Sequence, residues 1–268
     1  MNKKPTFFYR FCKVILGPVF KFYYRPTIIG KENIPEEGPV LIVGDHIHLY
    51  DQCLAIIATK RGQHWMAKRE YFDDKRVAWF FKASGCISVD RSKKDSNATN
   101  RALEVLRDGG IIGLFPEGTR NATKEENAMR IFEKTKSTEE FESFFKRVHP
   151  QKYSQILYVE NLFDNHKITL KEFNKALEDV DGYLKKKLTE DEYYKTILLD
   201  FKFGAVSMAQ KTNATIVPFG ISGDYKFKSD NLTIRFGKPF KVGNMPLEKA
   251  NTKLYNIVNN LIRENLKK

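Results

Sequence analysis

The chain has 268 residues, of which 41% are hydrophobic, and its formal net charge is +13. That length and hydrophobic content suffice for a full core, which excludes a disordered chain and allows one large α/β domain or two small ones. Three scattered cysteines, Cys12, Cys53 and Cys86, exclude a disulfide framework and a cysteine metal site, and they favour a reducing compartment.

The positive charge is unevenly distributed. Residues 121–199 hold 14 Lys/Arg and 15 Asp/Glu, so the whole basic excess lies in the rest of the chain. Such a field attracts phosphate-rich partners, which include nucleic acids, anionic lipid surfaces and phosphorylated small molecules. Charge alone does not choose among them.

Residues 1–25 combine aromatic and aliphatic side chains with basic ones and contain no acidic residue. The longest apolar run, Val14 to Phe20, is far shorter than the roughly 20 residues that span a bilayer, and no cleavage site typical of a signal peptide follows it. We therefore predict a membrane-interfacial helix. The alternative is a helix packed on its own domain with a solvated basic edge.

Residues 26–120 and 200–268 alternate short β-branched runs with helix-length segments. Such alternation predicts an α/β fold: a mixed, largely parallel sheet flanked by helices. The predicted strands are 27–30, 40–44, 64–67, 86–90, 111–115, 215–220 and 232–236. The predicted helices are 51–60, 75–84, 97–107, 204–212 and a last one from Leu247 onward.

Residues 121–199 interrupt this alternation with a polar stretch whose aromatic and leucine positions follow helical spacing. They predict an inserted helical subdomain. Within it, the run from Asn161 to Phe173 weakly resembles a calcium-binding helix-loop-helix with Glu172 as its last ligand. Because Phe163 and His166 stand where an oxygen ligand and a glycine are needed, we expect an ordinary helix-turn-helix instead.

The first candidate motif joins His46 and Asp51, which follow the apolar run Pro39 to Val43. Positions five apart do not face each other on a regular helix. A strand-to-helix turn is thus required to bring the Asp51 carboxylate to His46, where it would orient the ring as a general base. Taken alone, the pair also fits a surface histidine beside a helix-capping aspartate. His48 is a rival base, but the residue five positions on is Cys53.

Three further motifs follow in order. Gly85 to Arg91 is a strand that ends in a possible phosphate-binding arginine. In Phe115-Pro116-Glu117-Gly118-Thr119-Arg120, Pro and Gly bend the backbone, and Thr119 and Arg120 supply a hydroxyl and a cation. In Ile216 to Gly220, Pro218 is expected to break a strand, because proline cannot donate to a central ladder.

Together these motifs resemble those of the glycerophospholipid acyltransferases typified by bacterial 1-acyl-sn-glycerol-3-phosphate acyltransferase. His46 and Asp51 match the first block of that family, and the other three motifs match its second, third and fourth blocks. Shorter matches flank them at 30–35, 67–72, 201–204 and 236–239. The resemblance covers about 190 of the 268 residues.

The resemblance implies an acyltransferase domain at 26–120 and 200–268. Its reaction transfers a fatty acyl group from acyl-CoA or acyl carrier protein to the free hydroxyl of 1-acyl-sn-glycerol-3-phosphate, giving phosphatidic acid. His46 is the implied base and Asp51 its orienting partner, with no covalent acyl-enzyme and no cofactor beyond the co-substrate. The implied substrate-binding residues are Gly85, Arg91, Glu117, Gly118, Thr119, Arg120 and Pro218. Of these, Arg91, Gly118 and Arg120 would bind the acceptor phosphate, and Glu117 would order the site or contact the glycerol hydroxyls.

The expected location is the cytoplasmic side of a membrane, on an anionic surface and in a peripheral or monotopic manner. Two alternatives stay open: another lyso-lipid acceptor, or a non-catalytic lipid-binding membrane protein of the same fold. Nucleic acid is not an expected partner, since no nucleic-acid motif accompanies the charge.

The chain departs from the family in two ways. The family has Asn before the catalytic His and Ser two residues after it, whereas this chain has Asp45 and His48. A carboxylate at 45 could raise the pKa of His46 or could point away across the strand. The segment 121–199 replaces a much shorter connection, and it could form a lid, dock a carrier protein or be neutral.

Overall fold

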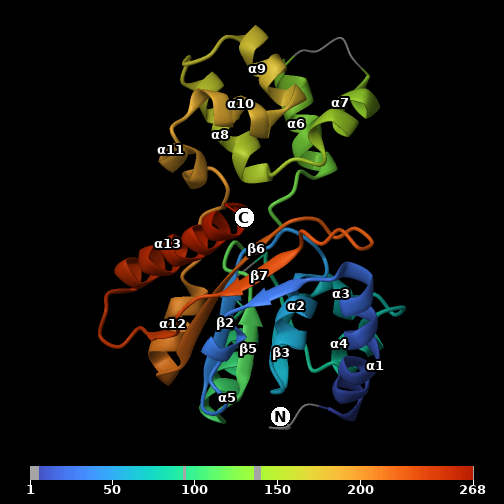
Figure 1. The fold of residues 1–268 in the computed structure, drawn as a ribbon, viewed down its shortest axis with the longest axis vertical. Coiled ribbons are helices and arrows are strands. Elements are labelled where there is room, and N and C mark those ends of the chain that lie inside the picture. Colours follow the sequence, from blue (N-terminus) through green and yellow to red (C-terminus); the bar gives the residue numbers. More distant parts are fainter. Residues whose placement is uncertain (1–5, 93–94, 136–139, 268) are drawn as a thin grey trace. The chain divides into compact units, whose positions relative to one another are not determined.

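The computed structural model describes residues 6–92, 95–135 and 140–267 (Figure 1). Its contacts divide the chain into two compact units. The first contains the residues up to Thr119 together with those from Asp200 onward, and the second is Arg120–Leu199.

A single sheet forms the centre of the first unit. In the described residues it has eight strands in the order β1-β7-β6-β2-β5-β3-β4, with β8 also paired to β6. β6, β2, β5, β3 and β4 run parallel, whereas β7 is antiparallel to β6 and β1 is parallel to β7, which confirms the mixed, largely parallel sheet. The strands are β1 (Thr27–Ile29), β2 (Val40–Gly44), β3 (Gln63–Lys68), β4 (Ile87–Val89), β5 (Ile111–Leu114), β6 (Thr215–Ser222), β7 (Thr233–Phe236) and β8 (Phe240–Lys241).

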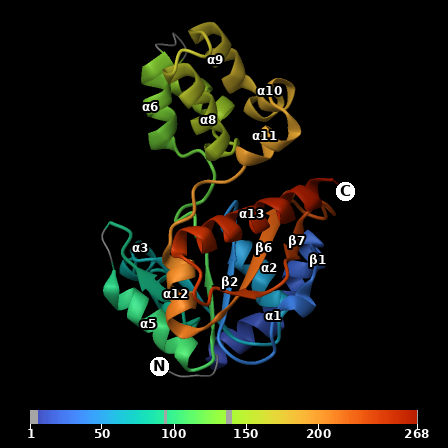
Figure 2. The same ribbon diagram turned by 90° about the vertical axis from the view of Figure 1, so that its left-hand side faces the viewer.

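Helices cover both faces of this sheet. Figures 1 and 2 show α12 and α13 on one face and α1 and α2 on the other. The helices are α1 (Phe7–Tyr24), α2 (Asp51–Ala58), α3 (Glu70–Asp73), α4 (Ala78–Ala83), α5 (Ser96–Arg107), α12 (Gly204–Thr212) and α13 (Leu247–Leu266), with a short 3-10 helix at Lys31–Asn33. The single-turn helix α3 and the two-residue strand β8 were not predicted, because elements this short show no hydrophobic periodicity in the sequence.

The core under α2 determines where the chain leaves β2. Val40 and Ile42 point to this side and belong to one buried cluster with Leu54 of α2. Gly44 ends the strand, and a Cβ there would lie 2.4 Å from the Phe219 ring. Only glycine therefore lets β2 and β6 approach each other at this point, just before His46.

Pro218 does not break its strand, contrary to the sequence-based prediction. β6 continues through it, with Pro218 paired to Val43 of β2. The backbone N and C=O of one residue point to the same side of a strand. Because the Pro218 carbonyl accepts from the Gly237 N–H at 2.8 Å, the proline nitrogen also faces the turn between β7 and β8. The missing N–H of Pro218 therefore costs the sheet no ladder hydrogen bond.

The N-terminal helix α1 is present and packs on its own unit while exposing apolar side chains. Thr6 caps it, accepting from the Tyr9 N–H, and Thr6 also donates to the carbonyl of Ala83 at the end of α4. Lys3 and Lys4, part of the predicted basic segment, lie outside the described residues. Among the described helices, none is both long and apolar enough to cross a membrane.

The second unit is helical and has its own core, which includes Phe144, Phe173 and Leu184, all fully buried. The loop before α9 has the predicted helix-turn-helix form. The Glu172 carboxylate accepts from the Thr169 N–H at 2.8 Å in a capping box, so Glu172 caps a helix there. The helices are α6 (Glu125–Thr135), α7 (Phe141–Val148), α8 (Tyr153–Asp164), α9 (Leu170–Glu178), α10 (Val180–Lys187) and α11 (Glu190–Lys195).

Candidate active site

The turn between β2 and α2 brings His46 and Asp51 together. His46 Nδ1 lies 2.8 Å from Asp51 Oδ2, and the two side chains are 13% and 0% exposed. An ionised carboxylate only accepts hydrogen bonds, so the imidazole proton sits on Nδ1 and Nε2 is the nitrogen that can take up another. The required strand-to-helix turn is confirmed.

The Asp51 carboxylate also organises the backbone of the turn. Its Oδ2 accepts from the N–H groups of Ile47 and His48 at 2.7 and 2.8 Å. Hydrogen bonds to a buried carboxylate are strong, and leaving such a group without them is costly. The turn is therefore built around Asp51. His48 contributes its backbone to Asp51, while its ring stacks on Tyr225 with centroids 4.1 Å apart.

Tyr225 completes the surroundings of Asp51, and the sequence motifs did not indicate it. Its hydroxyl donates to Asp51 Oδ1 at 2.7 Å from the loop between β6 and β7. Burial, followed by the charge of Asp51, raises the pKa of the Tyr225 hydroxyl far above its ordinary value. The hydroxyl thus keeps the proton that it donates.

The loop after β5 holds His46 from the other side. The Phe115 ring stacks on the His46 imidazole at a centroid distance of 3.9 Å and an angle of 8°. Glu117, which is 4% exposed, accepts from the backbone N–H of His46 at 2.8 Å. The first and third motifs are therefore joined through His46, and Glu117 has the ordering contact that was one of its two predicted roles.

Gly118 lies in the same loop under a lysine. Its φ is +72°, and a Cβ at this position would lie 2.7 Å from Lys202 Nζ. The Lys202 backbone N–H donates to the Pro116 carbonyl at 2.9 Å, which anchors the lysine to the loop. Thr119 is half-buried and Arg120 exposed. Gly118 and Thr119 thus lie beside the Lys202 ammonium within the first unit, and Arg120 is the first residue of the second unit.

The second motif lies at the edge of the sheet. Gly85 forms the turn into β4 with φ +73°, and its carbonyl is 2.8 Å from His64 Nδ1. Arg91 follows β4 and is exposed. The pKa of the Glu70 carboxyl is lowered by its own backbone N–H and by the charges of Lys68 and Arg91, which places Arg91 in a group of charged side chains beyond β3 and β4.

The sheet order separates this charged group from His46. β4 is the third strand from β2, and adjacent strands lie about 4.8 Å apart, so the strand ends are about 14 Å apart. Pro218 is buried within β6 instead of lying on a loop at a strand end. The structure thus gathers His46, Asp51, Glu117 and Gly118, and it leaves Arg91 and Pro218 outside that group.

Asp45 is turned toward the neighbouring strand β6, and its charge is one of the smaller causes that raise the pKa of Tyr225, the partner of Asp51. Its side chain is buried, and Oδ1 accepts from the Ile221 backbone N–H of β6 at 2.8 Å. The carboxylate therefore helps to hold the end of β6 beside the start of the turn.

Comparison with known proteins agrees with this geometry. A family model described as Acyltransferase matches residues 25–222, well over half of the chain. The chain belongs to the acyltransferase family. The match includes all four motifs and the region of the sheet that holds His46 and Asp51.

Two curated relatives of this chain are named 1-acyl-sn-glycerol-3-phosphate acyltransferase. The one from Bacillus subtilis is 29% identical over 115 residues, which are 42% of this chain and 58% of that protein. The one from Borreliella burgdorferi is 34% identical over 109 residues, 40% of this chain and 42% of that protein. The matches thus span about half the length of these relatives.

A solved structure has the same fold. The 1-acyl-sn-glycerophosphate (LPA) acyltransferase PlsC from Thermotoga maritima superposes with a TM-score of 0.55 at 17% identity, covering 94% of this chain and 80% of that one. At this identity the likeness is one of fold.

The candidate site also contains residues that the sequence motifs did not indicate. Lys202 lies in the segment that matches the family before the fourth block, so that match was a signal for it. Tyr225 lies between the matched segments 216–220 and 236–239 and belongs to neither, so no motif signalled it. In the described part of the chain, no group of three or more His, Cys, Asp or Glu is placed to hold a metal ion.

Proposed function

We propose that this chain transfers a fatty acyl group from a thioester to the free hydroxyl of 1-acyl-sn-glycerol-3-phosphate and forms phosphatidic acid. The observation that carries the proposal is the 2.8 Å contact between His46 Nδ1 and the buried Asp51 carboxylate at the end of β2. The names of the curated relatives support this choice of acceptor.

In the proposed reaction His46 acts as a general base. Nε2 removes the proton of the acceptor hydroxyl as its oxygen attacks the thioester carbonyl carbon. The carbon–sulfur bond then breaks, and the thiolate leaves and takes the proton from the imidazolium. Asp51 stabilises that imidazolium, and Glu117 holds the backbone of His46 in place.

The β5 loop is the proposed site for the acceptor phosphate. Lys202 Nζ lies against Gly118, and Thr119 and Arg120 follow directly. Lys202 and Thr119 offer a cation and a hydroxyl in the loop that also holds Glu117, a donor pair suited to a phosphate. Arg120 is the first residue of the second unit and stays a predicted phosphate ligand. Arg91, which follows β4, also stays a predicted phosphate ligand.

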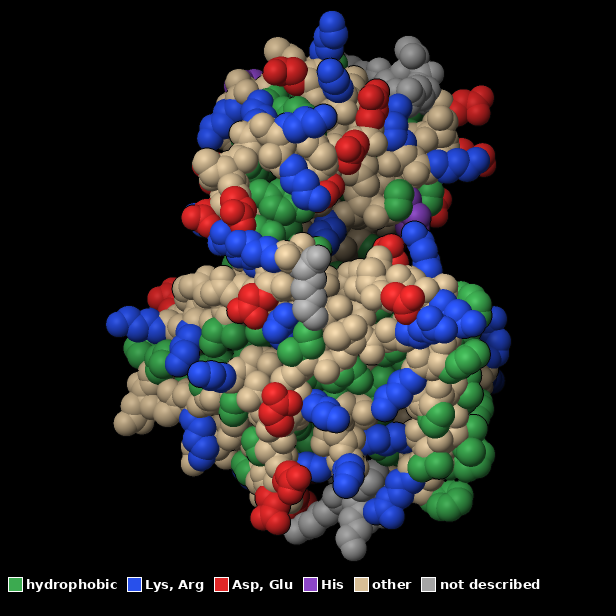
Figure 3. Space-filling view, viewed as in Figure 1, with side chains coloured by type: hydrophobic (Ala, Val, Ile, Leu, Met, Phe, Trp, Pro, Cys, Tyr) green, Lys and Arg blue, Asp and Glu red, His purple; other side chains and the backbone are tan. Residues whose placement is uncertain are grey.

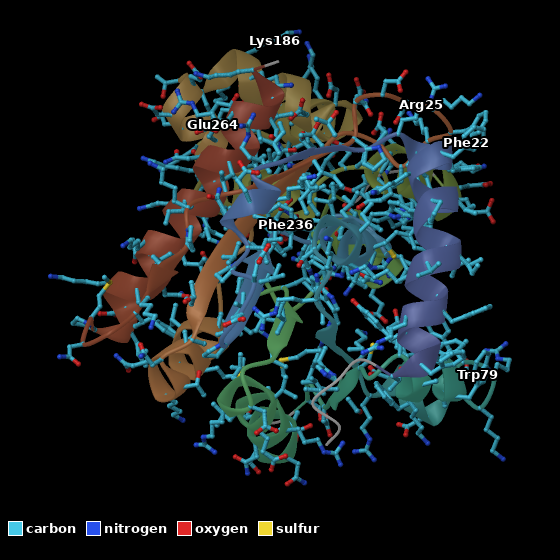
Figure 4. The ribbon with its side chains drawn as sticks, turned by 60° about the horizontal axis from the view of Figure 1, so that its bottom comes forward. Phe22, Arg25, Trp79, Lys186, Phe236 and Glu264 are labelled. Carbon is cyan, nitrogen blue, oxygen red and sulfur yellow. The ribbon has the colours of Figure 1, made fainter. Side chains whose placement is uncertain are left out.

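The exposed face of α1 is the proposed membrane contact. Phe7, Val14 and Phe22 are 85%, 69% and 65% exposed. Figure 3 shows hydrophobic side chains gathered over α1 at the right-hand edge, and Figure 4 shows Phe22 and Trp79 toward opposite ends of that helix. Lys228 lies over the Phe22 ring at 5.3 Å and adds a cation for anionic lipid. The cytoplasmic leaflet stays the expected side.

An activity matrix tests the proposal. The purified full chain, with vesicles of anionic lipid, is supplied with acyl-CoA or acyl carrier protein as donor and with lysophosphatidic acid or other lyso-lipids as acceptor. We expect lysophosphatidic acid to be the preferred acceptor. If the protein prefers another lyso-lipid, that lipid is its acceptor and lysophosphatidic acid is not. If no combination of donor and acceptor gives acyl transfer, the non-catalytic alternative is favoured.

The same assay tests the base. His46→Ala is expected to lower kcat by about 10²- to 10⁴-fold, because a positioned base contributes that much. His149→Ala, which removes an exposed histidine of the second unit, is the matched control and should not change turnover. Normal turnover of His46→Ala would remove His46 from the mechanism.

A further inference from the structure

Tyr225 lies on the loop between β6 and β7 and reaches the catalytic turn from a distant part of the chain. Its hydroxyl donates to Asp51 Oδ1 at 2.7 Å, across a separation of 174 residues. The other carboxylate oxygen, Oδ2, serves His46 Nδ1 and two backbone N–H groups. Both oxygens of Asp51 are thus held, and Tyr225 holds the one that His46 does not use.

The Tyr225 ring is packed on two sides. One face stacks on His48 at 4.1 Å and 17°, and the Tyr24 ring meets it edge-on at 5.6 Å. Tyr24 is the last residue of α1. The ring is therefore fixed between the catalytic turn and the helix whose exposed face is the proposed membrane contact.

A carboxylate held through one oxygen can rotate about its Cβ–Cγ bond and lose its alignment with the imidazole. The bond from Tyr225 opposes this rotation and also draws negative charge toward Oδ1, away from His46. Titratable groups around the dyad are Asp45, His48, Cys53, Glu117 and Tyr225 itself. Of these, Tyr225 and His48 donate directly to the Asp51 carboxylate, His48 through its backbone.

We propose that Tyr225 is a positioning residue of the acyl-transfer reaction, which holds the Asp51 carboxylate in the orientation that aligns His46. The inference rests on the proposed function. It extends the pair of His46 and Asp51 to a chain of three side chains from the β2 turn, α2 and the β6–β7 loop.

Tyr225→Phe tests this proposal, since it removes the hydroxyl and keeps the packed ring. We expect kcat to fall about tenfold with little change in KM. The acidic limb of the kcat/KM profile should move to higher pH, because Asp51 without its second donor stabilises the imidazolium more strongly.

Tyr50→Phe is the matched control. The Tyr50 ring belongs to the same aromatic group, 6.4 Å from Tyr225, and it is 41% exposed. Its hydroxyl has no hydrogen bond among the described residues, so both kcat and the pH profile should match those of the unaltered protein.

The melting temperature of each variant separates positioning from folding. Lower kcat with a shifted acidic limb and a near-normal melting temperature supports the proposal. The proposal is overturned if kcat of Tyr225→Phe stays within twofold of the unaltered protein. It is also overturned if the loss of kcat accompanies a lower melting temperature while the pH profile does not move. If the unaltered chain and Tyr50→Phe transfer no acyl group to any acceptor, the proposed function itself fails.

Discussion

The two halves of the predicted site, the turns after β2 and β5 and the turn after β4, are built in different ways. In the first, Asp51 and Glu117 are almost completely buried and bound to backbone N–H groups. In the second, Asp90 pairs at 3.3 Å with Arg69 from the neighbouring turn after β3, and Arg69 is 56% exposed and also pairs with Asp73 at 3.4 Å. Buried hydrogen bonds fix geometry, whereas exposed ion pairs contribute little energy and supply mainly charge.

This difference has a chemical reason. The proposed proton transfer from a hydroxyl to His46 needs reacting atoms within hydrogen-bond reach, which a rigid turn provides. A phosphate is attracted over longer distances and tolerates a mobile arginine or lysine. Substitutions of the buried carboxylates should therefore change kcat, and those that remove or displace a phosphate-binding cation should change KM.

Among the residues that surround His46, Asp51 should give the largest effect when it is replaced by alanine. Asp51→Ala removes the partner of His46 and leaves the N–H groups of Ile47 and His48 without their acceptor. We expect kcat to fall by about 10³- to 10⁴-fold and the free energy of unfolding to drop by about 3 kcal/mol. Asp51→Asn, which retains an acceptor oxygen, should lose similar activity with a smaller loss of stability in urea denaturation. Equal stability of the two variants would mean that the turn does not depend on the carboxylate.

Glu117 gives the next largest effect. Glu117→Ala removes the acceptor of the His46 N–H, so we expect kcat to fall by about 10²-fold. Glu117→Gln keeps an oxygen at that place and should stay within several-fold of the unaltered protein. If Glu117→Gln were as inactive as Glu117→Ala, the charge of Glu117 would have to act on the substrate. That result would favour its other predicted role, contact with the glycerol hydroxyls.

Arg91→Ala tests the exposed half. We expect KM for lysophosphatidic acid to rise about tenfold, with kcat unchanged and an effect that shrinks as salt is added. Arg76→Ala removes another exposed arginine, one that pairs with Asp74 at 2.8 Å, and serves as the control. A decrease in kcat for Arg91→Ala would place Arg91 in the rigid half of the site.

Gly118→Ala should have the smallest effect. A non-glycine residue at φ +72° costs about 1–2 kcal/mol, and the new methyl group would displace the Lys202 ammonium. Gly38→Ala is the control: its φ of +76° gives the same backbone cost, but an added Cβ there would have no atom within 4 Å. KM for the phosphate-bearing acceptor should rise in the first variant alone, while thermal melting shows a similar loss in both. An equal KM in the two variants would remove Lys202 from phosphate binding.

Most of the regular structure could be predicted from local patterns. The run Val40 to Val43 is apolar and, except for Leu41, β-branched, and it forms a strand buried on both faces. The interpretation of Pro218 was wrong because the rule against proline in a central strand considers the strand by itself. Here the turn between β7 and β8 lies where the missing donor would point, a fact that depends on residues 236–240.

The sequence by itself determined the alternation of strands and helices, the family, and the turn that joins His46 to Asp51, because each depends on residues close together in the chain. Only the tertiary structure decided the side to which Asp45 points, the contact of Glu117 with the His46 N–H and the bond from Tyr225 to Asp51. These contacts join residues 176, 71 and 174 positions apart. Local periodicity carries no information about such pairs, since they form only when the packed sheet brings distant loops to the same edge.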